Sequence, residues 1–256
     1  MTLLQAAILG IIEGITEFLP ISSTGHLIVA EKFMGIASTD TVKSFDIVIQ
    51  LGAIAAALVV YWNVLMKNRH LWKTTLAAFI PTAILGFLLH GSVKTYLLGN
   101  VAVVAWALGI GGILLLGFEY VWKSKEPETK DVHGITVKQA IIIGLVQTLA
   151  VIPGTSRSAA TIIGGMMLGI SRAAIVDFSF LLAIPTMAGA TVLDIAKSYG
   201  QLSFEHLGIF VVGFLLSFVT AYAVIRWLLR FIRTHTFIVF GVYRIGLAVV
   251  VFALLS

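Results

Sequence analysis

The chain has 256 residues, of which 59% are hydrophobic and only 11% are charged, with 17 lysines and arginines against 12 aspartates and glutamates. Soluble domains carry about 25% charged residues, so this composition excludes a soluble globular protein and indicates an integral membrane protein. The sequence contains no cysteine, which excludes disulfides, thiolate nucleophiles and thiolate metal sites.

The first apolar region, residues 3–35, is interrupted at its middle by the sequence LPISST at 19–24. Each half is too short to cross a hydrocarbon core of about 30 Å. We therefore predict a helix, a break and a second helix that returns to the starting side, which is a re-entrant hairpin. Residues 136–170, interrupted by IPGTSRS at 152–158, predict a second hairpin of the same kind.

Six other apolar segments are long enough to cross the membrane as helices, which satisfy their own backbone hydrogen bonds in lipid. In chain order they are residues 45–62, 74–91, 101–122, 174–195, 206–229 and 236–255. The predicted fold is an all-α polytopic membrane protein with six transmembrane helices and two re-entrant helical hairpins.

The hydrophilic segment KSKEPETKDVHG at 123–134 divides the chain near its centre. We predict a first half at 1–122 and a second half at 135–256, each a hairpin followed by three spans, within one membrane domain. A shift of 133 residues superposes three pairs of identical residues: Pro20 and Pro153, Ser23 and Ser156, and Phe45 and Phe178. Because each half has an odd number of spans, the two halves are predicted to form an inverted-topology repeat.

Basic residues gather on one side of this predicted topology, so the net charge of +5 does not indicate a nucleic-acid partner. Eleven lie in its loops: Lys67, Arg69, Lys73, Lys123, Lys125, Lys130, Lys138, Arg172, Arg226, Arg230 and Arg233. The opposite side has four: Lys32, Lys43, Lys94 and Lys197. By the positive-inside rule the first side is cytoplasmic, and both termini and the first hairpin's entrance are predicted to face outward.

Glu13 and Glu17 are separated by four residues, so they share one face of the first hairpin helix. An ionised side chain inside the membrane costs about 2.5–3.5 kcal/mol and needs a partner or a function. A divalent cation, Arg157 or a shared proton would relieve the repulsion between the two carboxylates. Oxygen-only ligands favour Mg²⁺ or Ca²⁺, whereas an ion pair with Arg157 would hold the two hairpins together.

Hydroxyl residues stand where the second helix of each hairpin begins: Ser22, Ser23 and Thr24 in the first, and Thr155, Ser156 and Ser158 in the second. Free backbone N–H groups and the positive end of the helix dipole bind anions there. Two such helix ends with Arg157 between them predict a phosphate site. The alternative is that these residues are ordinary N-caps.

His26 lies one helical turn beyond the hydroxyl residues of the first hairpin. It is a candidate general acid, general base or nucleophile in phosphoryl transfer, or else a packing residue. Arg157 is a candidate to neutralise charge on the transferred phosphoryl group. Gln50 is a candidate for the cavity wall or a bridge between helices, and Arg244 is either a second anion ligand or one partner of a structural ion pair.

The stretches EGITEFLPISSTGH at 13–26 and PGTSRSAATI at 153–162, with VYR at 242–244, closely resemble the undecaprenyl-pyrophosphate phosphatases of the BacA/UppP type. The resemblance covers nearly the whole chain. It implies a bacterial inner-membrane enzyme that hydrolyses undecaprenyl diphosphate to undecaprenyl phosphate and inorganic phosphate. Such an enzyme recycles the lipid carrier of peptidoglycan synthesis and lowers sensitivity to bacitracin.

The resemblance also implies which residues act, together with a homodimer and a site open to the outer face. The expected catalytic residues are Glu17, Ser23, His26 and Arg157, and the expected ligands of Mg²⁺ or Ca²⁺ are Glu13 and Glu17. The expected diphosphate-binding residues are Ser22, Thr24, Thr155, Ser156 and Arg157. Whether Ser23 or His26 is the nucleophile stays open.

A transporter of lipids or anions is the alternative function, because inverted repeats with broken helices are also the architecture of many secondary transporters. A transporter needs binding groups only. The cluster in this sequence adds a nucleophile and an acid–base group beside a candidate metal site, which favours an enzyme.

Overall fold

The computed structural model describes residues 1–96, 100–122, 127–197 and 207–253. Within these ranges the chain forms ten α-helices and two short 3-10 helices, as predicted for an all-α protein. The first five are α1 (Leu3–Thr16), α2 (Ser23–Phe33), α3 (Asp40–Lys67), α4 (Arg69–Tyr96) and α5 (Val101–Trp122). The others are η1 (Val132–Gly134), α6 (Val137–Gln147), η2 (Thr148–Val151), α7 (Arg157–Met167), α8 (Arg172–Lys197), α9 (Leu207–Phe231) and α10 (Ile238–Ala253).

Five of the helices are long and apolar enough to cross a membrane, namely α3, α4, α5, α8 and α9. They coincide with five of the six predicted spans and confirm a multi-pass membrane protein. The sixth predicted span corresponds to α10, whose 16 residues give it a length of about 24 Å. Its described part is therefore shorter than a hydrocarbon core of about 30 Å.

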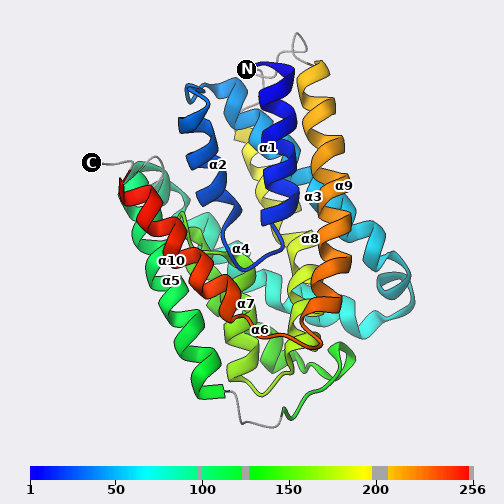
Figure 1. Ribbon diagram of the computed structural model, residues 1–256. Helices are drawn as coiled ribbons and strands as arrows, with labels where there is room; N and C mark the ends of the chain where they lie inside the picture. The colour runs from blue at the N-terminus through cyan, green and yellow to red at the C-terminus, as the bar shows by residue number, and fades with distance from the viewer. Residues whose placement is uncertain (97–99, 123–126, 198–206, 254–256) are drawn as a thin grey trace.

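The two predicted hairpins each contain two short helices separated by a break. Helix α1 has 14 residues and α6 has 11, so neither reaches across a bilayer. The first break follows Pro20 and contains Ser22 at φ 71°, while the second contains Gly154 at φ 88°. The breaks meet near the middle of the bundle (Figure 1), where the Ser158 hydroxyl donates to the Leu19 carbonyl oxygen at 2.8 Å.

The hairpins are built from matching hydrogen bonds. Thr2 and Gln5 form a capping box at the start of α1, as Thr136 and Gln139 do at the start of α6. The amides of Gln5 and Gln139 donate to carbonyl oxygens 29 residues further on, each at 3.2 Å. These pairs are related by a shift of 134 residues, one more than the shift that aligns the prolines.

Helices of one half pack on helices of the other. Helix α1 packs on α9, α6 packs on α4, and α5 pairs with α10 along its length. Glycines allow the close approach: a Cβ atom on Gly10 would lie 2.5 Å from the Gly213 carbonyl oxygen, and one on Gly144 would lie 2.0 Å from that of Ala78. Each hairpin is thus held by the opposite half.

Residues 127–134, the described part of the connection between the halves, lie at the opposite end of the bundle from the start of α1 (Figure 1). Of the predicted linker at 123–134, residues 123–126, with Lys123 and Lys125, lie outside the described residues; so do the side chains of Lys94 and Lys197. Near this end the buried Glu119 carboxylate of α5 accepts two hydrogen bonds from Arg172 of α8, at 3.1 and 2.6 Å. It also accepts the Phe237 backbone N–H at 2.9 Å, which ties three elements together.

Candidate active site

A cavity of about 500 Å³ lies where the two hairpin breaks meet helices α4 and α8. Its wall contains all five residues predicted to bind the diphosphate: Ser22, Thr24, Thr155, Ser156 and Arg157. Glu17, Ser23 and Gln50 also line it. The structure therefore brings together polar residues that are up to 140 positions apart in the sequence.

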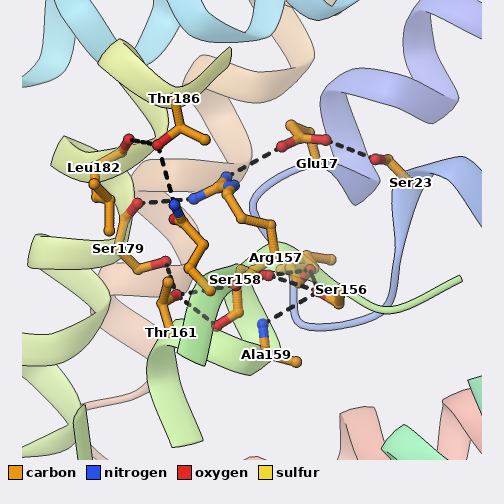
Figure 2. A network of polar contacts seen from close by, with 12 residues as sticks. Glu17, Ser23, Ser156, Arg157, Ser158, Ala159, Thr161, Ser179, Leu182 and Thr186 are labelled. Carbon is orange, nitrogen blue, oxygen red and sulfur yellow. Dashed lines mark hydrogen bonds and ion pairs between the residues drawn. The ribbon is translucent and has the colours of Figure 1, made fainter. Parts of the chain in front are cut away.

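The Glu17 carboxylate joins the two hairpins at the centre of this cavity (Figure 2). Its Oε2 atom accepts the Ser23 hydroxyl at 2.6 Å, and its Oε1 atom accepts the Arg157 Nη2 donor at 3.1 Å. Arg157 Nη1 donates to the Ser179 carbonyl oxygen at 2.8 Å, which fixes the guanidinium. Its Nε–H is buried and has no hydrogen-bond partner among the described residues.

Helices α2 and α7 both begin at this cavity, and a serine caps the N-terminus of each helix. The Ser22 hydroxyl accepts the Gly25 N–H at 3.4 Å at the start of α2, and the Ser156 hydroxyl accepts the Ala159 N–H at 3.2 Å at the start of α7. The Ser22 and Ser156 hydroxyls are therefore N-caps, as the alternative interpretation held, and both residues also line the cavity. The helix dipoles and free N–H groups add a positive potential suited to phosphate.

The Glu13 side chain is fully buried one helical turn before Glu17. Both of its carboxylate oxygens lack a hydrogen-bond donor among the described residues. Glu17 is close enough to interact with it, but two ionised carboxylates offer only acceptors to each other. The pair therefore needs a shared proton or a cation.

His26 is turned away from this cavity. Its Nδ1 atom lies 2.8 Å from the Ser22 carbonyl oxygen and its Nε2 atom lies 2.7 Å from the Tyr243 hydroxyl. The two rings stack with their centroids 5.5 Å apart. His26 is not among the lining residues, so of the four residues expected in catalysis the cavity brings together Glu17, Ser23 and Arg157.

Arg244 is fully buried and donates only to backbone carbonyl oxygens. Its acceptors are Leu108 at 3.3 Å and Ala107 at 3.0 Å in α5, Pro20 at 3.3 Å in the first break and Gly154 at 3.2 Å in the second. Neither an acidic partner nor the cavity is among its contacts in the described chain. Arg244 therefore fastens both hairpin breaks to α5, a role that the sequence interpretation did not include.

Three polar residues of the cavity wall were missed by the sequence interpretation. The Gln147 amide of α6 donates to the Thr82 hydroxyl of α4 at 2.9 Å and to the Thr186 hydroxyl of α8 at 3.2 Å. All three residues line the cavity. Gln147 is an amide within an apolar run, so the criterion that selected Gln50 would have found it as well.

The arrangement suits phosphoryl transfer. The Ser23 hydroxyl is hydrogen-bonded to one oxygen of the Glu17 carboxylate, and the Arg157 guanidinium is bonded to the other oxygen. Nucleophile and base within about 2.6–3.2 Å, with a third group orienting the base, form the usual signature of nucleophilic catalysis. The cationic group can stabilise negative charge that develops on phosphoryl oxygens.

Comparison with known proteins agrees with the predicted family. A family model described as bacitracin resistance protein BacA matches residues 6–250. The chain is 49% identical to the undecaprenyl-diphosphatase of Aquifex aeolicus over 250 residues, and this match covers 98% of this chain and 97% of that protein. It is 47% identical over 246 residues to the undecaprenyl-diphosphatase of a Sulfurovum species, covering 96% of each chain. These matches extend over nearly the whole sequence, and the chain belongs to the BacA family.

Proposed function

We propose that this chain hydrolyses undecaprenyl diphosphate to undecaprenyl phosphate and inorganic phosphate in the cavity between the hairpin breaks. Undecaprenyl-diphosphatase activity is the activity by which its relatives of 45–49% identity are named. The observation that carries the proposal is the Ser23 hydroxyl hydrogen-bonded to Glu17, with Arg157 bonded to the other oxygen of the same carboxylate. A transporter needs no such activated hydroxyl.

The Ser23 oxygen is the proposed nucleophile. It attacks the terminal phosphorus, an oxygen–phosphorus bond to Ser23 forms, and the bond from that phosphorus to the bridging oxygen breaks. Glu17 takes the hydroxyl proton, and undecaprenyl phosphate leaves with the bridging oxygen. Water then attacks the phosphorus of the phosphoserine, a new phosphorus–oxygen bond forms, and the bond from phosphorus to the Ser23 oxygen breaks. The Ser23 oxygen recovers its proton from Glu17, and the oxygen and both hydrogens of the water leave on inorganic phosphate.

Arg157 and the two helix N-termini are proposed to hold the diphosphate in line with Ser23. Arg157 lines the cavity, and its Nη2 group donates to Glu17, the proposed base. Fixed donors aimed at phosphoryl oxygens stabilise the charge of the transition state without reorganising during the reaction. His26 is proposed to position Ser22 through its contact with that carbonyl oxygen, rather than to contact the phosphate.

A divalent cation fits the carboxylates of α1. The buried and unpartnered oxygens of Glu13, together with Glu17, are the proposed ligands, because hard cations such as Mg²⁺ and Ca²⁺ prefer oxygen donors. No cluster of three or more acidic, histidine or cysteine side chains suited to a metal occurs within the residues described, so diphosphate oxygens and water would complete the coordination. Such an ion would neutralise charge on the bound diphosphate.

We further propose the inverted repeat and the orientation that the sequence indicated, and the homodimer that the family resemblance implied. Three features support two structurally similar halves. They are the matched capping boxes, the packing of each hairpin on the opposite half, and the pairing of α5 with α10. The excess of basic residues at one side supports termini and a cavity entrance that face outward from the bacterial cytoplasmic membrane. In that place the enzyme would recycle the lipid carrier of peptidoglycan synthesis and so confer bacitracin resistance.

Phosphate release by the purified protein tests the proposed activity. In detergent with undecaprenyl diphosphate and Mg²⁺ or Ca²⁺ we expect stoichiometric inorganic phosphate and undecaprenyl phosphate. Excess EDTA is expected to lower the rate at least about tenfold, and added cation should restore it, because Glu13 and Glu17 would otherwise repel each other and the diphosphate. Undiminished release in EDTA would remove the metal from the proposal. An inactive protein that moves lipid across vesicles would favour the transporter.

Labelling of introduced cysteines tests the orientation, because the natural chain contains no cysteine. In intact cells an impermeant thiol reagent is expected to leave Asp131→Cys unlabelled. The matched variant Lys43→Cys, whose side chain is 63% exposed at the predicted outer side, is expected to react. Both should react after the membrane is permeabilised. Reaction of Asp131→Cys alone in intact cells would reverse the proposed orientation.

A further inference from the structure

The cavity has a second end that the proposed chemistry does not use. Beyond the hydroxyls and Arg157 it continues between α4 and α8, where its wall is formed by Phe79, Ala83, Gly86 and Phe87 of α4 and by Met187 and Ala190 of α8. The α4 residues follow one another at intervals of four, three and one, which places them on one side of the helix. One cavity thus joins a phosphate-binding end to an apolar cleft.

Small residues keep this cleft open. A Cβ atom on Gly86 would have no atom within 4 Å, whereas one on Gly189 of α8 would lie 3.1 Å from the Phe79 ring. The cleft is therefore wide at Gly86 and closed at Phe79. Phe87 lines the cavity and is 65% exposed on the outer surface of the helix bundle, so the wide end opens beside it toward the lipid-facing surface.

Gln147, Thr82 and Thr186 stand between the two ends and offer no free donor. The hydroxyl of Thr82 donates to the Gly144 carbonyl oxygen at 2.9 Å, and that of Thr186 donates to Leu182 at 2.7 Å. Both hydroxyls accept from the Gln147 amide, which uses its two hydrogens in this way. The remaining Gln147 Oε1 atom is buried and without a partner among the described residues.

Gln147, Thr82 and Thr186 thus form a border inside the cavity, which separates the polar head of an amphipathic ligand from its apolar chain. Phosphate oxygens need donors, which Arg157 and the helix N-termini supply on one side and which the border lacks. Thr186 and Arg157, both labelled in Figure 2, line the same cavity, so the change from donor-rich to donor-free wall occurs within it. An anionic head is held on the Arg157 side, and an apolar chain attached to it is directed into the cleft.

We propose that the cleft between α4 and α8 binds the isoprene units next to the diphosphate, and that the rest of the prenyl chain leaves past Phe87 into the bilayer. The proposal rests on the proposed function, since it assumes a prenyl diphosphate at Arg157. The cavity volume of about 500 Å³ is typical of a pocket for a small ligand. It therefore holds the head group and only the first part of a long chain.

Filling the cleft with Gly86→Trp tests the proposal, with Gly117→Trp as the matched control. Gly117 of α5 also has no atom within 4 Å of an added Cβ, but it does not line the cavity. With farnesyl diphosphate, Gly86→Trp is expected to raise KM at least about tenfold, because apolar pocket contacts change specificity by about 10–200-fold. Dimethylallyl diphosphate has a single isoprene unit, which fills only the part of the cleft next to the diphosphate and does not reach its wide end at Gly86, so its KM should change less than about twofold.

The outcomes separate the cleft from the function. If wild type hydrolyses neither substrate, the proposed function fails and the cleft proposal with it. If wild type is active and Gly86→Trp leaves KM for farnesyl diphosphate unchanged, or raises it equally for both substrates, only the cleft proposal is overturned. A second measurement needs no variant: a photoreactive group on the first isoprene unit is expected to cross-link to residues 79–87 or 186–190 of the wild type. Cross-links confined to other helices would contradict the proposal.

Discussion

Replacing Ser23 with alanine is expected to abolish phosphate release, lowering kcat by at least about ten-thousandfold, as removal of a catalytic serine does elsewhere. The reason is geometric, because the Ser23 hydroxyl donates to the Glu17 carboxylate at 2.6 Å. Alanine leaves the carboxylate with no hydroxyl to deprotonate. Peptide mapping of rapidly quenched wild-type enzyme with substrate should also find a phosphoryl group on Ser23.

Two variants give this prediction its controls. Thr24→Ala removes the neighbouring hydroxyl of the same cavity and is expected to cost about tenfold or less, since Thr24 has no bond to Glu17 among those described. His26→Gln removes a contact with Tyr243 but changes no side chain that lines the cavity, so a moderate loss of activity is expected. If Ser23→Ala kept a tenth of the activity while His26→Gln lost it, the nucleophile would be His26.

Arg244→Met is expected to cause the largest loss of stability of any single change at the hairpin breaks. Methionine fills part of the volume but donates no hydrogen bonds. The Ala107 and Leu108 oxygens keep their partners within α5, whereas the Pro20 and Gly154 oxygens in the breaks lose a donor in a buried place. Each unsatisfied buried group costs about 1–3 kcal/mol, and we expect a total of at least about 3 kcal/mol. The midpoint of thermal unfolding in detergent measures the loss.

Arg230→Met is the matched control, because Arg230 is an exposed arginine near the end of α9 and its replacement should leave the midpoint unchanged. A second variant reaches Arg244 without altering it. A Cβ atom on Gly111 would lie 2.2 Å from Arg244 Nη2, so Gly111→Ala is expected to displace the guanidinium and to destabilise the protein as well. Unfolding midpoints equal to wild type for both Arg244→Met and Gly111→Ala would show that Arg244 does not fasten the breaks.

The positions of Glu17, Ser23 and Arg157 in one cavity were predictable because charged and hydroxyl side chains are costly in a membrane and stand out against an apolar sequence. The helix breaks were predictable for a related reason, since proline and glycine interrupt apolar runs that are too short to span. Five of the six spans follow from hydropathy alone.

The partners of these residues were less predictable. Arg244 bonds to backbone carbonyl oxygens, which every residue carries, so no side chain elsewhere in the sequence marks its acceptors. The pairing of His26 with Tyr243 joins positions 217 residues apart and depends on how α2 packs beside α10. Neither contact leaves a periodic pattern, and both required the packed helices.

The packing of α1 on α9 sets a condition on biosynthesis. About 190 residues separate the end of α1 from the start of α9, which corresponds to about 10–40 s of translation at 5–20 residues per second. During that interval the first hairpin can pack on α3 and α5 but lacks α9, the helix on which α1 packs most extensively. Glu17 also has no Arg157 until α7 has been inserted. A ribosome-bound or truncated first half should therefore be unable to hydrolyse undecaprenyl diphosphate. The first hairpin is also the segment of the nascent chain for which a membrane insertase or chaperone would be needed.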